Sequence, residues 1–158
     1  MLAFFFALVF GFVRPVVAAP SLVQGPSMEP TLRTGDRVLV EKLGYRFEAP
    51  QRGDVVLIRD ENGGDDLIKR VAALPGETVS VRGDTVYVDG EPLRGARASR
   101  DLPGFSGLRT TVPPGHVYVL GDNRERSLDS RSYGPVPLER VEGEALATYW
   151  PLDRLRTL

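Results

Sequence analysis

The stretch Val23-Gln-Gly-Pro-Ser-Met-Glu-Pro-Thr-Leu32 separates an apolar N-terminal segment from a remainder with the pattern of β-strands. Pro26 and Pro30 bracket Ser27, and because proline fixes φ and lacks a backbone N–H, neither a helix nor a central strand passes easily through this stretch. Gly25 lets the backbone come close to another group. We expect a stiff, exposed bend that presents a hydroxyl beside unpaired backbone N–H groups, which suits a nucleophile next to an oxyanion hole. An ordinary Pro-Gly turn with a solvated serine is the alternative.

The chain after this bend consists of short runs rich in β-branched residues, separated by turn signals such as Asn62-Gly63-Gly64. Strands are predicted at residues 37–42, 54–59, 67–74, 78–82, 85–88, 116–120 and 144–149. Arg82-Gly-Asp-Thr85 predicts a tight hairpin turn, and residues 96–111 predict a surface loop. No segment after residue 20 has a sustained helical period. The sequence therefore predicts an all-β domain with barrel-like antiparallel sheets, without repeats or a second domain.

Composition excludes several classes of function. The 158 residues are enough for one domain with a core, and 20 Lys and Arg against 21 Asp and Glu give no electrostatic case for nucleic acid. The chain has no cysteine, which excludes disulfides and thiolate chemistry, and a single histidine, His116, which leaves few metal ligands. His116 is interpreted as the entry to a strand. We expect no metal and no other cofactor.

Residues 1–13, Met-Leu-Ala-Phe-Phe-Phe-Ala-Leu-Val-Phe-Gly-Phe-Val, are almost purely apolar and precede Arg14-Pro15, which ends a helix. As a helix they would span about 20 Å, less than the roughly 30 Å of a bilayer core. A cleaved signal peptide ending near Val17-Ala18-Ala19 is one interpretation, although its n-region would lack a positive charge. A buried core helix is another, although it would have no polar face. We favour the C-terminal part of a membrane anchor at residues 1–19, truncated at its N-terminus, followed by one β-rich domain at residues 20–158.

Two cations interrupt the apolar run Leu67-Ile-Lys-Arg-Val-Ala-Ala-Leu74. Because strand side chains alternate between faces, Lys69 and Arg70 point in opposite directions, and Lys69 shares its face with Leu67 and Val71. A lysine on an apolar face loses hydration in its charged form, which lowers its pKa, and a neutral amine can take a proton from a serine. The alternative is a lysine with a buried stem and an ammonium group in water.

A polar segment, Gly121-Asp-Asn-Arg-Glu-Arg-Ser-Leu-Asp-Ser-Arg131, follows the predicted strand at residues 116–120. Its turn-forming residues predict a loop held by its own hydrogen bonds, in which Asp129 and Arg131 can pair. The segment contains neither His nor Cys, which argues against a metal site.

Together these segments resemble type I signal peptidases, the bacterial leader peptidases with a Ser-Lys dyad. The resemblance is carried, in the family's order, by Ser27-Met28-Glu29-Pro30-Thr31-Leu32, Arg52-Gly53-Asp54-Val55-Val56, Ile68-Lys69-Arg70-Val71 through Glu77, and Gly121-Asp122-Asn123-Arg124 through Arg131. It covers residues 22–137 and implies the all-β fold shared by signal peptidases and LexA-like proteins. It also implies a membrane-anchored serine endopeptidase that removes N-terminal signal peptides from exported preproteins after Ala-X-Ala-like sites.

The resemblance also implies roles for individual residues. Ser27 would be the nucleophile and Lys69 the general base that replaces histidine. Ser127 would hydrogen-bond the Lys69 amine, and Asp129 and Arg131 would brace the loop that carries Ser127.

The oxyanion hole and the substrate pocket follow from the same resemblance. The Ser27 N–H would supply one oxyanion donor, and Gly25 stands where some family members have a serine hydroxyl, so a second donor must be backbone or water. Substrate would lie extended beside strand edges, as an added strand does. The small, apolar pockets for the two alanines would be formed by Val23, Met28, Leu32 and Ile68. Larger members carry a second β-domain after the lysine-bearing strand, and because residues 84–112 are short we expect little more than the catalytic core.

The implied partners are preprotein signal peptides and membrane lipid. The implied location is the cytoplasmic membrane, crossed once, with the catalytic domain on its extracytoplasmic side. Two alternatives stay open. A LexA-like or UmuD-like protein would cut its own chain with the same dyad, but this sequence has neither an Ala-Gly nor a Cys-Gly dipeptide for such a cut. A non-enzymatic membrane-tethered β-module, in which Lys69 stays charged, is the other alternative.

Overall fold

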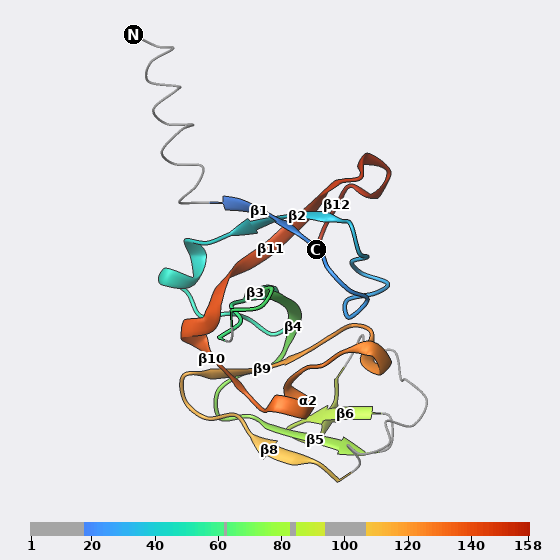
Figure 1. The fold of residues 1–158 in the computed structure, drawn as a ribbon. Helices are drawn as coiled ribbons and strands as arrows, with labels where there is room; N and C mark the ends of the chain where they lie inside the picture. Colours follow the sequence, from blue (N-terminus) through green and yellow to red (C-terminus); the bar gives the residue numbers. More distant parts are fainter. Residues whose placement is uncertain (1–17, 62, 83–84, 94–106) are drawn as a thin grey trace.

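A computed structural model describes residues 18–61, 63–82, 85–93 and 107–158, and their strands form two antiparallel sheets (Figure 1). The strands are β1 (Ala18–Leu22), β2 (Arg37–Glu41), β3 (Val55–Ile58), β4 (Leu67–Ala73), β5 (Thr78–Arg82), β6 (Thr85–Val88), β7 (Glu91–Pro92), β8 (Arg109–Thr111), β9 (His116–Leu120), β10 (Val136–Pro137), β11 (Val141–Trp150) and β12 (Arg156–Thr157). The helical elements are short: η1 (Gly44–Arg46), η2 (Arg124–Arg126), α2 (Ser130–Tyr133), η3 (Leu138–Arg140) and η4 (Leu152–Arg154). The all-β prediction is confirmed.

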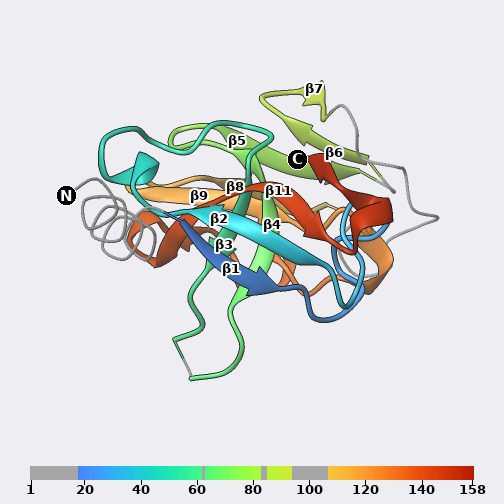
Figure 2. The same ribbon diagram turned by 90° about the horizontal axis from the view of Figure 1, so that it is seen from above.

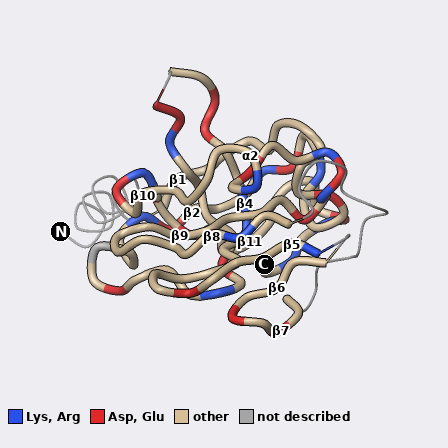
Figure 3. Tube along the Cα trace, turned by 90° about the horizontal axis from the view of Figure 1, so that it is seen from below, with Lys and Arg blue, Asp and Glu red and all other residues tan. Residues whose placement is uncertain are grey.

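The larger sheet has the strand order β1-β2-β11-β3-β4-β9-β10, with β12 paired to β11. β11 pairs with β2 on one side and β3 on the other, and its register shifts at several points. Such bulges bend a strand and increase its twist, so β11 curves across the molecule in Figure 1. Seen from above, the hairpin that joins β3 and β4 projects from the body of the molecule (Figure 2). Asp60, Glu61, Asp65 and Asp66 make this hairpin acidic (Figure 3).

The smaller sheet, β7-β6-β5-β8, is built from the short region that follows the lysine-bearing strand. One hydrophobic cluster joins the two sheets, because valines of β5 and β6 pack with Ala73 of β4 and with Tyr118 and Leu120 of β9. The smaller sheet is therefore packed onto the same core as the larger one.

The seven predicted strands are all present, with ends that differ by a few residues. The loop prediction for residues 96–111 is wrong at Arg109–Thr111, which form β8 and pair with β5. Residues 94–106 lie outside the described residues, as do the turn residues 83–84, although Arg82 lies opposite Thr85 as a hairpin requires. His116 begins β9, as predicted. The sequence did not predict β1, β7, β10 or β12, and the last three have two residues each, too few to show a period.

The predicted anchor falls outside the described residues, apart from Ala18 and Ala19, which belong to β1 and pair with β2. Within the described ranges, no helix combines the length and the hydropathy needed to cross a membrane. The rest of the predicted anchor, residues 1–17, stays a prediction.

Candidate active site

Ser27 lies between β1 and β2 in a loop of residues 23–36, here called the Ser27 loop. Backbone hydrogen bonds close the base of this loop: the Val23 N–H donates to the Asp36 carbonyl at 2.8 Å, and the Gly35 N–H donates to the Val23 carbonyl at 3.0 Å. A closed base restricts where the tip can move, so the loop presents Ser27 at a defined position.

Gly25 has a φ of 76°, in the left-handed region that favours glycine. A Cβ added to Gly25 would meet nothing within 4 Å. The glycine is therefore required by the backbone conformation, and the close approach expected from the sequence does not occur within the described part of the chain. The Ser27 N–H makes no hydrogen bond to another described residue, so it is available to an oxyanion.

Lys69 is a buried residue of β4, 3% exposed, and its Nζ lies 3.0 Å from Ser27 Oγ. Nζ also donates to the Ile68 carbonyl at 3.0 Å. Burial lowers the pKa of Lys69, and the negative charge of Asp129 opposes that change. The lysine expected on an apolar face is thus withdrawn from water, and the side chain does not extend its amine into solvent.

The polar segment after β9 meets the Ser27 loop at Gly121. A Cβ on Gly121 would collide with the Ser127 side chain and with the Ser27 carbonyl oxygen. The Asn123 N–H donates to that same carbonyl at 2.9 Å. Ser127 Oγ is buried and has no hydrogen-bond partner in the described part of the chain, so the hydrogen bond to Lys69 implied by the resemblance is not present.

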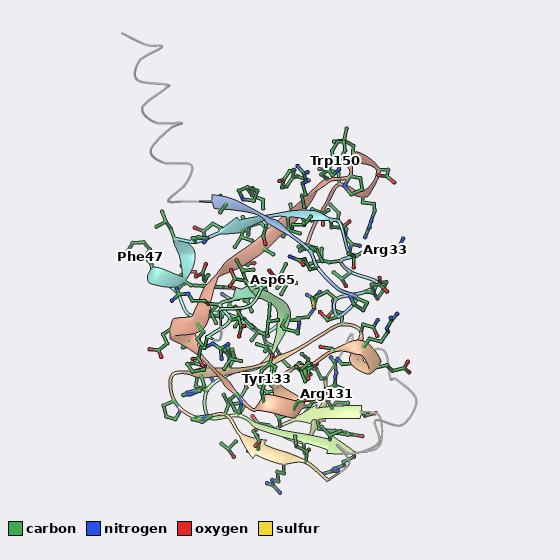
Figure 4. All side chains as sticks on the ribbon, viewed as in Figure 1. Arg33, Phe47, Asp65, Arg131, Tyr133 and Trp150 are labelled. Carbon is green, nitrogen blue, oxygen red and sulfur yellow. The ribbon has the colours of Figure 1, made fainter. Side chains whose placement is uncertain are left out.

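Asp129 and Arg131 form the pair expected from the sequence. Arg131 Nε donates to Asp129 Oδ1 at 2.8 Å, with both side chains almost fully buried. Asp129 also accepts a hydrogen bond from the Gly121 N–H at 3.0 Å, and Arg131 Nη2 donates to the Arg124 carbonyl at 2.7 Å. Arg131 lies on α2 (Figure 4). The pair therefore joins α2, η2 and the end of β9.

A second, partly buried ion pair was not foreseen from the sequence. Arg70 donates to both carboxylate oxygens of Asp122, at 2.9 and 2.8 Å. Burial by itself raises the pKa of Asp122, but the hydrogen bonds and positive charge of Arg70, with the charge of Arg124, help to lower that pKa overall. The pair thus connects β4 with the segment after β9. The available signal was Arg70 itself, a cation in an apolar strand that needs an acidic partner.

The four residues predicted for the substrate pocket pack in one hydrophobic cluster and are no more than 8% exposed: Val23, Met28, Leu32 and Ile68. A cavity of about 710 Å³ lies beside the Ser27 loop, with Pro30, Thr31, Arg70 and Asp122 in its lining. None of the four predicted residues lines this cavity. In this structure all four side chains are buried.

β4 has an open edge near Lys69. Among the described strands, β9 pairs with β4 at Arg70, Val71 and Ala73, so Leu67–Lys69 are paired on one side, with β3. The other side leaves backbone groups that an extended peptide could pair with.

The described strands thus form an all-β fold in which a buried lysine amine lies beside a serine hydroxyl. The chain belongs to the signal peptidase family, peptidase S26, whose sequence profile matches residues 1–150. The resemblance to type I signal peptidases is confirmed, and the chain is a serine endopeptidase of that family.

Individual proteins similar to this chain are named signal peptidase I. The chain is 39% identical to "Probable signal peptidase I-1" of Synechocystis sp. over 150 residues, which cover 90% of this chain and 76% of the relative. It is 34% identical to "Signal peptidase IB" of Staphylococcus aureus over 161 residues, covering 91% of this chain and 84% of the relative. The crystal structure of a signal peptidase I from Enterococcus faecalis has a TM-score of 0.50 and 35% identity, and covers 61% of this chain and 97% of its own. These matches favour an enzyme over the non-enzymatic module.

Proposed function

We propose that the chain removes N-terminal signal peptides from exported preproteins, with Ser27 as nucleophile and Lys69 as general base. The observation that carries this proposal is the 3.0 Å distance between Lys69 Nζ and Ser27 Oγ at a buried amine. Because burial lowers the pKa of Lys69, the neutral amine accepts the Ser27 proton as Oγ attacks the carbonyl carbon of the last signal-peptide residue. The Ser27 N–H then donates to the oxyanion.

Collapse of this intermediate breaks the scissile C–N bond. The Lys69 ammonium gives its proton to the departing nitrogen, which becomes the amino terminus of the mature protein, and the signal peptide stays as an ester on Ser27. Lys69 next takes a proton from water, whose oxygen attacks the ester carbon. The bond between that carbon and Ser27 Oγ then breaks, the Lys69 ammonium returns its proton to Oγ, and the signal peptide leaves with a free carboxyl terminus. The charge of Asp129 raises the pKa of Lys69, which limits the cost of the transient ammonium.

Ser127 is proposed to orient the Lys69 amine. The Lys69 amine can make one more hydrogen bond than its contacts to Ser27 and Ile68 account for. The buried Ser127 hydroxyl is packed against Gly121, and the Ser27 carbonyl lies at the same place. Asp129 and Arg131 hold the segment that carries Ser127.

Substrate binding is proposed at the open edge of β4. An extended Ala-X-Ala segment would pair with the backbone of Leu67–Lys69 and bring the carbonyl of its last alanine to Ser27. The buried cluster that includes Met28 of the Ser27 loop would form a floor that excludes large side chains.

A single-pass anchor in the cytoplasmic membrane, with the catalytic domain on the extracytoplasmic side, completes the proposal. It is supported by the apolar residues 1–13 and by exposed large apolar side chains on adjacent strands: Leu22 of β1, Leu39 of β2 and Trp150 of β11. Figure 4 shows Trp150 at the end of the molecule where β1 and β2 lie. Retention of the full chain in washed membranes, and its release after deletion of residues 1–17, would test the anchor.

The catalytic proposal is tested by incubating the full chain in detergent with a preprotein that has an Ala-X-Ala site. We expect a mature product whose new amino terminus follows that site, as read by mass spectrometry, and no product from Ser27→Ala. Cleavage by Ser27→Ala at the wild-type rate would contradict the proposal. Cleavage of its own chain with an intact preprotein would instead favour the LexA-like alternative.

A further inference from the structure

The C-terminal segment, residues 151–158, contains η4 and β12 and lies beyond the residues that the family profile matches. β12 pairs with β11, and the Leu158 N–H donates to the Leu146 carbonyl at 2.9 Å. The segment thus folds back along the end of β11 and places the C-terminus near the Ser27 loop (Figures 1 and 2).

Arg154 of this segment forms an ion pair with Asp36, at the base of the Ser27 loop. Arg154 Nη1 lies 2.7 Å from Asp36 Oδ1, and the Asp36 side chain is 1% exposed against 24% for Arg154. Asp36 Oδ2 accepts a hydrogen bond from the Arg33 N–H at 2.9 Å, whereas Oδ1 has no hydrogen bond of good geometry from the described residues. Arg154 is therefore the charge that compensates a buried carboxylate, and its contact is electrostatic.

Asp36 is one of the two residues, with Gly35, whose backbone joins the two ends of the Ser27 loop. Its carbonyl accepts from the Val23 N–H, and its own N–H donates to the Arg33 carbonyl at 3.0 Å. The segment makes a further contact with the buried side of the loop, because Leu158 packs against the cluster that contains Val23 and Met28. Ser27 and Met28 are adjacent in the chain, so both contacts constrain the loop that carries the hydroxyl.

We propose that Arg154 is a positioning residue for the cleavage reaction. Its charge holds Asp36 in place, Asp36 fixes the base of the Ser27 loop, and the fixed loop keeps Ser27 Oγ at hydrogen-bonding distance from Lys69 Nζ. The inference rests on the proposed roles of Ser27 and Lys69. Since Arg154 does not touch the open edge of β4, its loss affects the chemical step more than substrate binding.

The test uses Arg154→Met, with Arg156→Met as the matched control because Arg156 is exposed on the neighbouring β12. All variants are full-length and are assayed with the same preprotein well below their Tm. We expect Arg154→Met to lower kcat by between about tenfold and about a hundredfold while KM stays within about twofold. Arg154→Lys, which keeps the charge, should recover most of the lost kcat, and Arg156→Met should match the wild type.

Two further measurements separate positioning from general stability. In the double variant Asp36→Asn/Arg154→Met the buried charge is gone, so kcat should fall no further than in Arg154→Met. Hydrogen exchange at the Val23 and Gly35 amides should accelerate in Arg154→Met, while exchange at Val119 in β9 stays unchanged.

An unchanged kcat in Arg154→Met would overturn the inference, and so would equally faster exchange at all three amides. If Ser27→Ala is inactive and Arg154→Met is fully active, the inference about Arg154 is wrong and the proposed function stands. Full activity of Ser27→Ala would overturn the proposed function and this inference with it.

Discussion

Lys69→Met is the substitution that bears most directly on the proposed mechanism. Methionine has nearly the volume and shape of the lysine stem, so it fills the buried site in β4 and removes only the amine. The amine loses its contacts with Ser27 Oγ and the Ile68 carbonyl, both at 3.0 Å. Each such hydrogen bond contributes about 1 kcal/mol, and relief from burying an amine offsets part of that loss. We expect a folded protein whose free energy of unfolding changes by no more than about 2 kcal/mol.

The catalytic effect should be far larger. General base catalysis supplies about 10²- to 10⁴-fold in rate, so kcat/KM should fall by that factor, equivalent to about 3 to 5 kcal/mol of transition-state stabilisation. Lys69→Arg should be equally inactive, because a guanidinium does not release its proton at working pH. It should also unfold more easily than Lys69→Met, because it buries a permanent charge.

Lys69 also determines the direction in which folding stability and activity change with pH. Burial puts the pKa of Lys69 in the folded chain below its ordinary 10.5, so the unfolded chain binds the proton more readily. The contribution of Lys69 to folding stability therefore declines as pH falls from 10.5 to the lowered pKa, and it is constant below that pKa. Activity should fall about tenfold per pH unit below the lowered pKa, as the amine becomes protonated.

The assay combines initial rates of preprotein cleavage over a range of pH with thermal unfolding of the wild type and of both variants at each pH. Unfolding at each pH separates lost chemistry from lost structure, and the Tm of the wild type should rise relative to that of Lys69→Met as pH rises towards 10.5. If Lys69→Met folds and keeps a kcat/KM within about tenfold of the wild-type value, Lys69 is not the general base.

Three further outcomes are expected. Ser127→Ala should keep the wild-type Tm, because its hydroxyl has no partner in the described structure to lose, but should lower kcat by about tenfold; full activity would remove Ser127 from the site. Asp129→Asn should cost about 3 to 5 kcal/mol in urea unfolding, because it leaves the Arg131 guanidinium buried without its carboxylate. It should also move the acid limb of the activity profile to lower pH, since the Asp129 charge raises the pKa of Lys69; an unmoved limb would disprove that coupling. Gly25→Ala should lower the free energy of unfolding by about 1 to 2 kcal/mol, because the backbone there has positive φ, and an unchanged Tm would contradict this.

The strands that sequence reasoning found are those with strong local patterns. Val55–Ile58 and Leu67–Ala73 are apolar runs bounded by turn residues, and both are buried strands in the structure. The strand Arg109–Thr111 was missed because three residues with mostly exposed side chains carry no usable period. Its pairing with β5 comes from the neighbouring strand and is not encoded in the segment itself.

Local sequence patterns likewise identified some residues of the site and not others. Ser27 and Lys69 could be singled out because proline, glycine and an amine in an apolar run have local consequences. The pair Arg70–Asp122 could not, because its two residues meet through the register of β4 against β9. The buried state of the four predicted pocket residues also depends on how the Ser27 loop is laid over the larger sheet.

The sequence by itself determined the β character of the chain, the bend at Ser27 and the family, since these follow from residue types and their order. Only the tertiary structure decided three contacts. The Lys69 amine lies at hydrogen-bonding distance from Ser27, Arg70 forms an ion pair with Asp122, and Arg154 near the C-terminus forms one with Asp36. The physical reason is that a buried charge takes its partner from whichever chain segment packs against it. That choice depends on strand register and on bulges between strands far apart in the sequence, which no local pattern records.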